Sequence, residues 1–428
     1  MNGNITKDGI TRDLEAMKAN GIAGYQLFEA GSGIPIGPVE SLSDEWVDLI
    51  LHTLKESERL GLEFAMHNCP GWSSSGGPWI TPDKAMQIIT WSETKITGGK
   101  QVRIQLPTPK HMFDYYIDTY CLAIPANMKV IPRLSILELS NRLDKDGVLT
   151  WDVPTGEWLI MRFGQTAKDQ KNKSAPSKST GLDCDKFSTE ALDYHLNCMF
   201  KRLMPAMEKI AKHSKIGLLI DSYETGDQDW TSDMPAYFEQ SHGYELYPFL
   251  PVLANKIVES EESTKRFLFD FRRVRADMFA ERYYGHFQKR CKEKGIITYT
   301  EPYGGNMMEE LQVAQQLDIN MGEFWCGQTV LWANYKYNRT VKQVASIVHT
   351  LGGKVVGAEA FTSEPDADKW LQYPYALKSL GDYMFTRGLS RIYFHRFAHQ
   401  PHPTAAPGMT MGAWGLHFDR TNTWWKPG

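Results

Sequence analysis

The chain has 428 residues, a formal net charge of −4 and no clustering of Lys and Arg, which argues against a nucleic-acid partner. No apolar run approaches the roughly 18 residues that a membrane span requires, and the first residues lack the basic start and apolar block of a signal peptide. The Cys residues are scattered without a CxxC pair, which disfavours a zinc ribbon or a disulfide-dense scaffold.

Helical and strand patterns alternate in the first part of the chain. The expected helices cover residues 10–21 and 42–61, and the expected strands cover residues 22–30 and 62–69. Ser43 is a typical helix N-cap and Gly61 a typical helix stop. Alternation of this kind predicts a parallel sheet with helices outside it.

The alternation stops between about residues 95 and 180. Three segments there have the turn-bounded pattern of antiparallel strands, at residues 100–107, 115–125 and 156–164. Residues 168–181, "KDQKNKSAPSKSTG", have the composition of an exposed polar loop. We therefore expect a β-rich insertion that grows from a loop of the parallel sheet.

The alternation then resumes as far as residue 399. Strands are expected at residues 216–224, 296–305, 317–325, 354–362 and 391–399, with a long helix that ends near Gly295. Seven parallel strands are expected in all, so a closed eight-stranded barrel would need one more strand ahead of Met1.

The predicted fold is an α/β (β/α)8 barrel of the TIM type that lacks its first strand and carries a β-rich insertion. Four regions are expected: residues 1–95 as the first part of the barrel, 96–180 as the insertion, 181–400 as the second part with the catalytic carboxylates, and 401–428 as the start of a C-terminal extension. Both ends are expected to have been cut from a longer protein.

Polar residues recur where the expected strands end, which is where barrels of this type keep their active sites. These residues are Glu29, His67, Asn68, Asp221, Glu224, Glu301, Glu323, Glu359, His395 and His399. A single buried acid is often only a hydrogen-bonded core residue, but several around one rim favour a polar active site.

Two carboxyl groups that face each other across a bond can hydrolyse a glycoside, one as acid and the other as base or nucleophile. The remaining acids could hold a hard cation such as Ca²⁺, although the chain has no EF-hand loop. A zinc hydrolase that uses His395 and His399 is an alternative, because "HRFAH" has the spacing of two zinc ligands on a helix. That segment follows a strand, however, and lacks the Glu of HExxH.

The segment "CPGWSSSGG", residues 69–77, follows the second expected strand. It is neither a GxSxG nucleophile elbow nor a phosphate loop with a following Gly-Lys-Ser/Thr. Its Gly residues are more consistent with a tight turn that presents Trp72 and Trp79 to a ligand.

Seven segments resemble the signature segments of glycoside hydrolase family 106 and occur in the same order across nearly the whole chain. They lie at residues 3–24, 67–87, 181–192, 218–226, 322–325, 357–362 and 417–425. "PGWSSSGGPW" and "HFDRTNTWW" are the most distinctive of them.

The resemblance implies a calcium-dependent α-L-rhamnosidase that removes terminal α-L-rhamnose from plant pectin or other glycans with inversion. By position, Glu224 would be the general acid, Glu359 the base, and Glu323 and Glu301 the Ca²⁺ ligands. Weaker candidates for sugar contacts are His67, Asn68, Trp72, Asp221, His395 and Asp419.

Members of the family usually have an additional first strand, further β-sandwich modules and an export signal, so the resemblance implies a periplasmic or secreted full-length protein. The segment itself gives no location. A truncated barrel that binds a carbohydrate without cleaving it is the alternative to an active glycosidase.

Overall fold

Seven parallel strands form the main sheet of the computed structural model, in the order β1-β2-β12-β14-β15-β16-β17. They are β1 (Gly24–Leu27), β2 (Glu63–His67), β12 (Ile216–Ile220), β14 (Ile297–Thr300), β15 (Ile319–Cys326), β16 (Val356–Ser363) and β17 (Arg391–Phe394). The structure describes residues 1–73, 75–213, 215–326, 330–363, 370–412 and 417–426, with only the backbone for 330–338.

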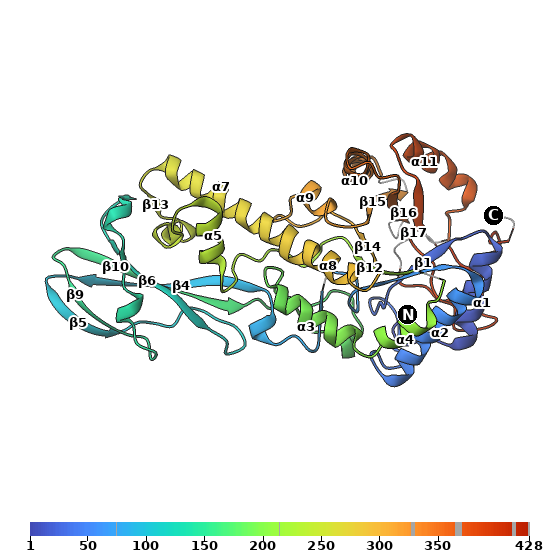
Figure 1. Cartoon of the computed structure of the whole chain (residues 1–428), viewed down its shortest axis with the longest axis horizontal. Helices are drawn as coiled ribbons and strands as arrows, with labels where there is room; N and C mark the ends of the chain where they lie inside the picture. Colours follow the sequence, from blue (N-terminus) through green and yellow to red (C-terminus); the bar gives the residue numbers. More distant parts are fainter. Residues whose placement is uncertain (74, 214, 327–329, 364–369, 413–416, 427–428) are drawn as a thin grey trace.

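Helices cover the outside of this sheet and continue along the molecule (Figure 1). They are α1 (Lys7–Ala19), α2 (Asp44–Leu60), α3 (Thr189–Phe200), α4 (Met204–Ile210), α5 (Met234–His242), α6 (Leu250–Leu253), α7 (Glu261–Met278), α8 (His286–Lys292), α9 (Glu310–Ala314), α10 (Val330–Thr350) and α11 (Pro374–Thr386). Both caps predicted for α2 are confirmed. The Ser43 side chain accepts a hydrogen bond from the Trp46 N–H, and Gly61 ends the helix with a φ of 65°.

The remaining strands are antiparallel, apart from one short parallel pair, and lie mainly at the other end of the elongated molecule (Figure 1). They are β3 (Gly76–Gly77), β4 (Gln87–Thr97), β5 (Lys100–Gln105), β6 (Ile117–Pro125), β7 (Val130–Ile131), β8 (Leu137–Glu138), β9 (Val148–Val153), β10 (Glu157–Ala167), β11 (Leu182–Asp183) and β13 (Ile257–Val258). One sheet has the order β4-β10-β6-β8, and β5 pairs with β9. β3 and β11 pair with each other and lead the chain back to the parallel sheet.

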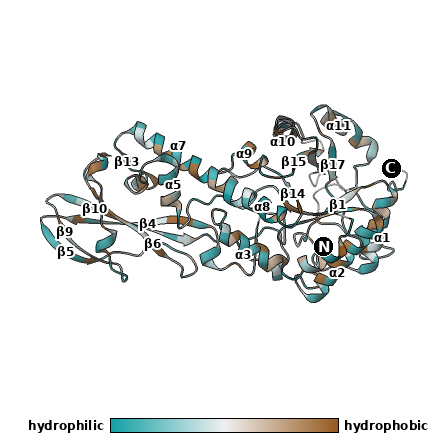
Figure 2. Ribbon diagram, viewed as in Figure 1, coloured by the Kyte–Doolittle hydropathy of each residue, from teal (hydrophilic) through white to brown (hydrophobic). Residues whose placement is uncertain are grey.

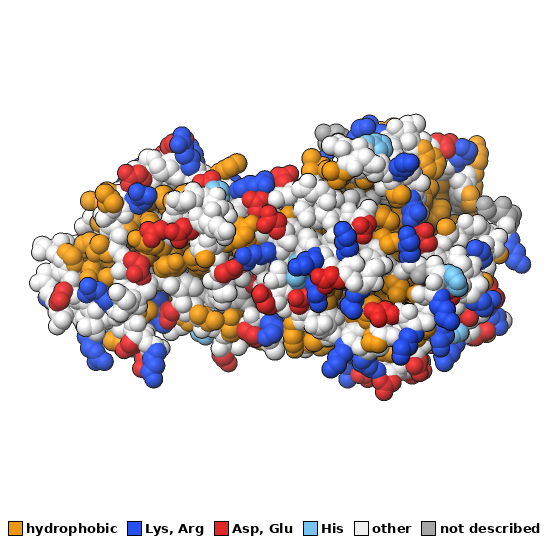
Figure 3. Space-filling view, viewed as in Figure 1, with side chains coloured by type: hydrophobic (Ala, Val, Ile, Leu, Met, Phe, Trp, Pro, Cys, Tyr) orange, Lys and Arg blue, Asp and Glu red, His pale blue; other side chains and the backbone are white. Residues whose placement is uncertain are grey.

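The amphipathic pattern that predicts the helices also determines which faces they bury. α7 is predominantly hydrophilic along its length (Figure 2), and its buried residues are Phe267, Phe271, Val274 and Met278. Their spacing of three or four residues is that of one helix face. On the face of the molecule shown in Figure 3, acidic and basic side chains are interspersed. Among the described helices, none is both long enough and apolar enough to cross a membrane.

The parallel sheet curves into a nearly closed barrel, which confirms the predicted α/β barrel in its general form. β1 and β17 are its two edge strands. The interior is bridged by a hydrogen bond of 3.2 Å from Gln26 Nε2 in β1 to Met321 Sδ in β15. Arg391 at the start of β17 forms an ion pair of 3.1 Å with Glu63 at the start of β2. The two edges therefore lie on either side of one open seam.

Candidate active site

The acids at the strand ends share the inner face of the barrel because side chains on a strand alternate with a period of two residues. An apolar cluster inside the barrel contains Ala65, Leu219, Tyr299 and Met321. Two residues further along the same strands, the chain carries His67, Asp221, Glu301 and Glu323. The polar layer thus lies directly above an apolar floor.

Strand register aligns these acids in pairs. Glu323 of β15 is the register partner of Glu359 of β16. Ile220 is paired with Thr300, so Asp221 and Glu301 both follow the ends of adjacent strands at the same level. Parallel strands therefore bring acids as distant in sequence as Asp221 and Glu359 to one rim.

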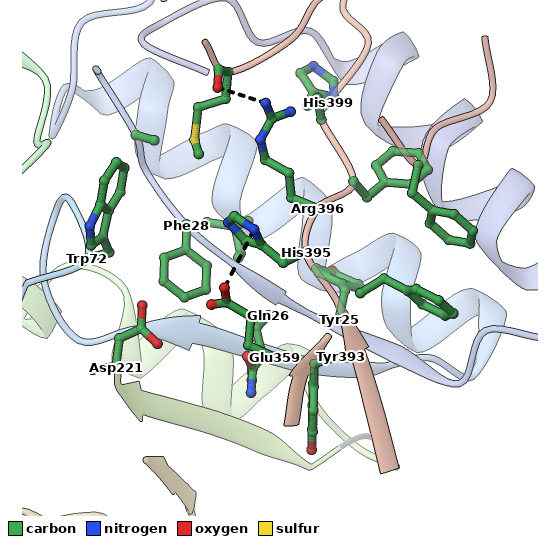
Figure 4. Close-up of a pocket in the computed structure, with 18 of the residues that line it drawn as sticks. Tyr25, Gln26, Phe28, Trp72, Asp221, Glu359, Tyr393, His395, Arg396 and His399 are labelled. Carbon is green, nitrogen blue, oxygen red and sulfur yellow. Dashed lines mark hydrogen bonds and ion pairs between the residues drawn. The ribbon is translucent and has the colours of Figure 1, made fainter. Parts of the chain in front are cut away.

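A cavity of about 1060 Å³ opens at this rim and continues into the seam between β1 and β17. Its lining includes the acids Glu29, Asp221, Glu224, Glu301, Glu323 and Glu359, together with Trp72, Lys173 and His395. Figure 4 shows Trp72 and Asp221 on one side of the cavity and Glu359 with His395 facing them. Glu224 and Glu359 therefore open onto the same cavity.

Three carboxylates lie at the centre of the rim. Oxygen atoms of Asp221, Glu301 and Glu359 all lie within 4.8 Å of one another. Burial raises the pKa of Asp221 well above its usual value, and the charges of Glu359 and Glu224 raise it further. Burial likewise raises the pKa of Glu301, with further contributions from Asp221 and Glu359. The cluster is costly when fully ionised, so it favours a shared proton or a bound cation.

Glu301 has one oxygen that is paired and one that is not. The Tyr303 hydroxyl donates a hydrogen bond to Glu301 Oε2. Its other oxygen, Oε1, is buried without a hydrogen-bond partner among the residues that the structure describes. An unsatisfied carboxylate oxygen within a group of three acids is suited to a hard cation such as Ca²⁺.

Two further buried acids line the cavity beside this group. Burial raises the pKa of Glu323 to about 8, with the nearby charge of Glu359 as the second cause. The Trp325 indole N–H donates to Glu323 Oε1. Burial also raises the pKa of Glu29 to about 7. Glu323, which the resemblance implies as a calcium ligand, lies outside the group of three within 4.8 Å but shares its cavity.

Glu359 is oriented by two neighbours. The Thr362 hydroxyl donates to Glu359 Oε1 over 2.6 Å, and His395 Nδ1 lies 3.0 Å from the Thr362 oxygen. Because the Thr362 hydroxyl uses its proton on Glu359, it accepts from His395, which assigns a proton to His395 Nδ1. These two hydrogen bonds fix Oε1 of Glu359 and leave its Oε2 as the oxygen available to a ligand.

Glu224 also has one oxygen engaged. Its Oε2 accepts from the Trp72 indole N–H over 3.3 Å and from Lys173 Nζ over 2.9 Å. Neither an indole nor an ammonium can accept a hydrogen bond. A proton on Glu224 would therefore reside on Oε1.

Three of the residues proposed for sugar contacts do not line the cavity. His67 and Asn68 are buried, and the Asn68 side chain donates to the Leu219 carbonyl over 2.9 Å. Burial lowers the pKa of His67 to about 4, so His67 is neutral. Its Nε2 accepts a hydrogen bond from the Asp221 N–H. Asp419 is buried, and its carboxylate accepts from the Thr421 N–H over 2.7 Å. The other three candidates, Trp72, Asp221 and His395, line the cavity.

The two histidines of "HRFAH" are directed to different partners. His399 Nδ1 lies 2.8 Å from Asp13 Oδ2, and its Nε2 is 3.4 Å from the Thr6 N–H at the start of α1. Figure 4 shows His399 apart from His395, beyond Arg396. The geometry gives no support to zinc ligation by this pair.

Sequence reasoning did not identify four residues that contact the acids: Lys173, Tyr303, Trp325 and Thr362. Tyr303, Trp325 and Thr362 lie two or three residues after an identified acid, so the strand-end rule could have found them. Lys173 belongs to the loop that was expected to be exposed, but Asn172 and Ser179 of this loop are 2% and 0% exposed. The polar composition of residues 168–181 does not predict that Asn172 and Ser179 are buried.

Comparisons with known proteins agree with this architecture. The profile of glycoside hydrolase family 106, described as alpha-L-rhamnosidase, matches residues 1–114 and 110–427. A protein of Formosa agariphila named "Putative beta-glucuronidase" is 40% identical over 459 residues, which cover 100% of this chain and 38% of that protein. The structure of a rhamnosidase from Novosphingobium sp. PP1Y superimposes with a TM-score of 0.90 at 23% identity, over 100% of this chain and 57% of that one. The chain thus spans less than two thirds of the length of each of these relatives.

Proposed function

The chain belongs to glycoside hydrolase family 106, and we propose that it removes terminal α-L-rhamnose from a glycan with inversion at the anomeric carbon. The observation that carries the proposal is that Glu224 and Glu359 line one cavity, with Asp221 close enough to be influenced by both charges. An inverting mechanism requires two such carboxyl groups, about 6.5–9.5 Å apart, with room for a water molecule.

Glu224 is the proposed general acid. Its Oε2 is held by Trp72 and Lys173, so the proton that is transferred comes from Oε1. That proton passes to the glycosidic oxygen as the bond between this oxygen and the anomeric carbon breaks. The leaving sugar therefore lies on the Trp72 and Lys173 side of the cavity.

Glu359 is the proposed general base. Thr362 holds its Oε1, and Oε2 accepts a proton from the water that attacks the anomeric carbon from the opposite face. The water oxygen forms the new bond, and the leaving sugar departs with the proton from Glu224. Proton exchange with solvent then restores Glu224 as the acid and Glu359 as the base.

Asp221 and Glu301 are the residues that would hold Ca²⁺, at the edge of the group that also includes Glu359. The unpaired Oε1 of Glu301 and the raised pKa values of both acids are consistent with a cation there. Bound Ca²⁺ would supply positive charge and coordination for sugar hydroxyls. Glu323 lies beside this group and is the proposed residue for positioning the sugar and completing the ion's surroundings.

An assay with an aryl α-L-rhamnoside tests the proposal. We expect rhamnose release, with β-configured rhamnose as the first product in a proton NMR time course. A second candidate, β-glucuronidase activity, is favoured by the name of the Formosa relative, so an aryl β-D-glucuronide belongs in the same assay. Faster cleavage of the glucuronide would contradict the rhamnosidase proposal. Binding of rhamnose without any release, in folded protein, would support a non-catalytic carbohydrate-binding barrel.

A further inference from the structure

The loop of residues 168–181 is held against the active-site rim by its backbone. The Lys173 N–H donates to Ser73 Oγ over 2.7 Å, and the Lys173 carbonyl accepts from the Trp72 N–H over 3.3 Å. Gly71 permits this close approach, because a Cβ at Gly71 would lie 2.1 Å from the Lys173 carbonyl oxygen and its φ is +84°. The backbone of Lys173 thus has a fixed position above the cavity.

The Lys173 side chain is directed to the proposed acid. Its ammonium lies 2.9 Å from Glu224 Oε2, and the Lys173 and Glu224 side chains are 56% and 36% exposed. Of the acids Glu29, Asp221, Glu224, Glu301, Glu323 and Glu359, Glu224 is the one that forms an ion pair with a Lys or Arg in the part of the chain that the structure describes. Such an exposed pair is weak and can exchange its partner at little cost.

Lys173 and Trp72 both flank Glu224, which places them next to the leaving sugar if Glu224 is the acid. We propose that they form a binding subsite for an anionic leaving sugar, a hexuronate or a sulfated hexose that carries the terminal rhamnose. The ring of that sugar packs on Trp72, and its anionic group takes the place of Glu224 as the partner of Lys173. This inference rests on the proposed function, because the function determines which side of Glu224 faces the leaving group.

The charge of the cavity gives Lys173 its effect on specificity. The carboxylate of Glu224 lies beside the leaving sugar, so it repels an anionic group there unless a cation is present, and Lys173 is the cation at that side. A charge-assisted hydrogen bond from Lys173 offsets this repulsion for an anionic sugar. The bond that Lys173 forms with a neutral sugar is weaker and contributes less to the binding free energy. After the ammonium has moved to the substrate, the Trp72 N–H still occupies Glu224 Oε2, so Oε1 remains the oxygen that faces the glycosidic oxygen.

The test compares a rhamnosyl hexuronate with the matching rhamnosyl hexose in the wild type and in Lys173→Met, Lys173→Arg and Lys171→Met. Lys171 is the matched control, because it lies two residues away in the same loop with a 57% exposed side chain paired with Asp169. We expect the ratio of kcat/KM for uronate over neutral substrate to fall about tenfold or more in Lys173→Met. Lys173→Arg should retain most of the ratio, since it keeps the charge, and high salt should reduce the ratio in the wild type.

An equal ratio in the wild type and Lys173→Met, or an equal fall in Lys171→Met, would overturn the proposal. Equilibrium binding separates this failure from a failure of the proposed function. A methyl hexuronide should bind the wild type more tightly than the matching methyl hexoside, and Lys173→Met should abolish that difference even if no rhamnoside is cleaved. A sulfated methyl hexoside in the same titration shows which anionic group is preferred. Equal binding of all three, or no binding of either anion at millimolar concentration, would contradict the subsite.

Discussion

Glu359→Gln should lower kcat on a rhamnoside by roughly 10²–10⁴-fold, because the amide cannot accept the proton of the attacking water. The fold should survive, since an amide oxygen can still accept the hydrogen bond from the Thr362 hydroxyl. The measurement is kcat on an aryl rhamnoside and on a rhamnosyl sugar, with circular dichroism and thermal unfolding as controls for folding.

Glu224→Gln should differ from Glu359→Gln in its dependence on the leaving group. A nitrophenolate leaves without much help from an acid, whereas a sugar alkoxide needs a proton, so the loss in Glu224→Gln should be much larger for the sugar. Glu40→Gln is the matched control, because Glu40 is exposed and does not line the cavity. Unchanged kcat in both Glu224→Gln and Glu359→Gln would contradict the assignment of both residues. An equal fall in kcat on the aryl rhamnoside and on the rhamnosyl sugar in Glu224→Gln would contradict Glu224 as the acid.

Removal of Ca²⁺ by a chelator should lower kcat/KM by about tenfold to a hundredfold or more, because Asp221, Glu301 and Glu359 would then repel one another at the rim. Millimolar Ca²⁺ should restore activity, and Zn²⁺ should not. The measurement is kcat/KM after dialysis against the chelator and again after each ion is added back. Restoration by Zn²⁺ alone would favour the zinc alternative, and full activity without Ca²⁺ would contradict the calcium site.

The stabilising effect of Ca²⁺ should grow as the pH rises. A carboxyl group whose pKa is raised on folding stabilises the protein below its unfolded pKa and loses that contribution as the pH rises through the folded pKa. For Glu323 these values are 4.5 and about 8, so the calcium-free protein should lose stability between them. Ca²⁺ favours the ionised acids, so its shift of the unfolding midpoint should be larger at about pH 8 than at about pH 5. An equal shift at both pH values would indicate that the ion binds elsewhere.

Much of the site follows from strand periodicity alone. A buried apolar run that ends in an acid predicts a strand of a parallel barrel with a functional residue at its carboxyl end. Applied to Asp221, Glu301, Glu323 and Glu359, this rule places all four acids on one rim, and the structure brings them together. The rule works because the strands are parallel, so their carboxyl ends face the same side of the barrel, although β15 and β16 continue past Glu323 and Glu359 to Cys326 and Ser363.

The sequence could not predict contacts that depend on the path of a loop. His67 obeys the strand-end rule but is directed to backbone atoms, because burial favours its neutral form and the N–H groups around it need acceptors. For Lys173 the error is the opposite one. The polar composition of its loop predicts exposure away from the site, but the turn at Gly71 and Ser73 holds the Lys173 backbone at the rim. Neither outcome is encoded in local composition, since both depend on segments distant in sequence.

If Glu224 and Glu359 act as acid and base, one sugar ring lies between them. A crystal structure of the Glu359→Gln variant with an intact rhamnoside should show the glycosidic oxygen within hydrogen-bonding distance of Glu224 Oε1. It should also show a water molecule between the anomeric carbon and residue 359. A rhamnose bound outside this cavity, or with both side chains on the same face of the ring, would contradict it.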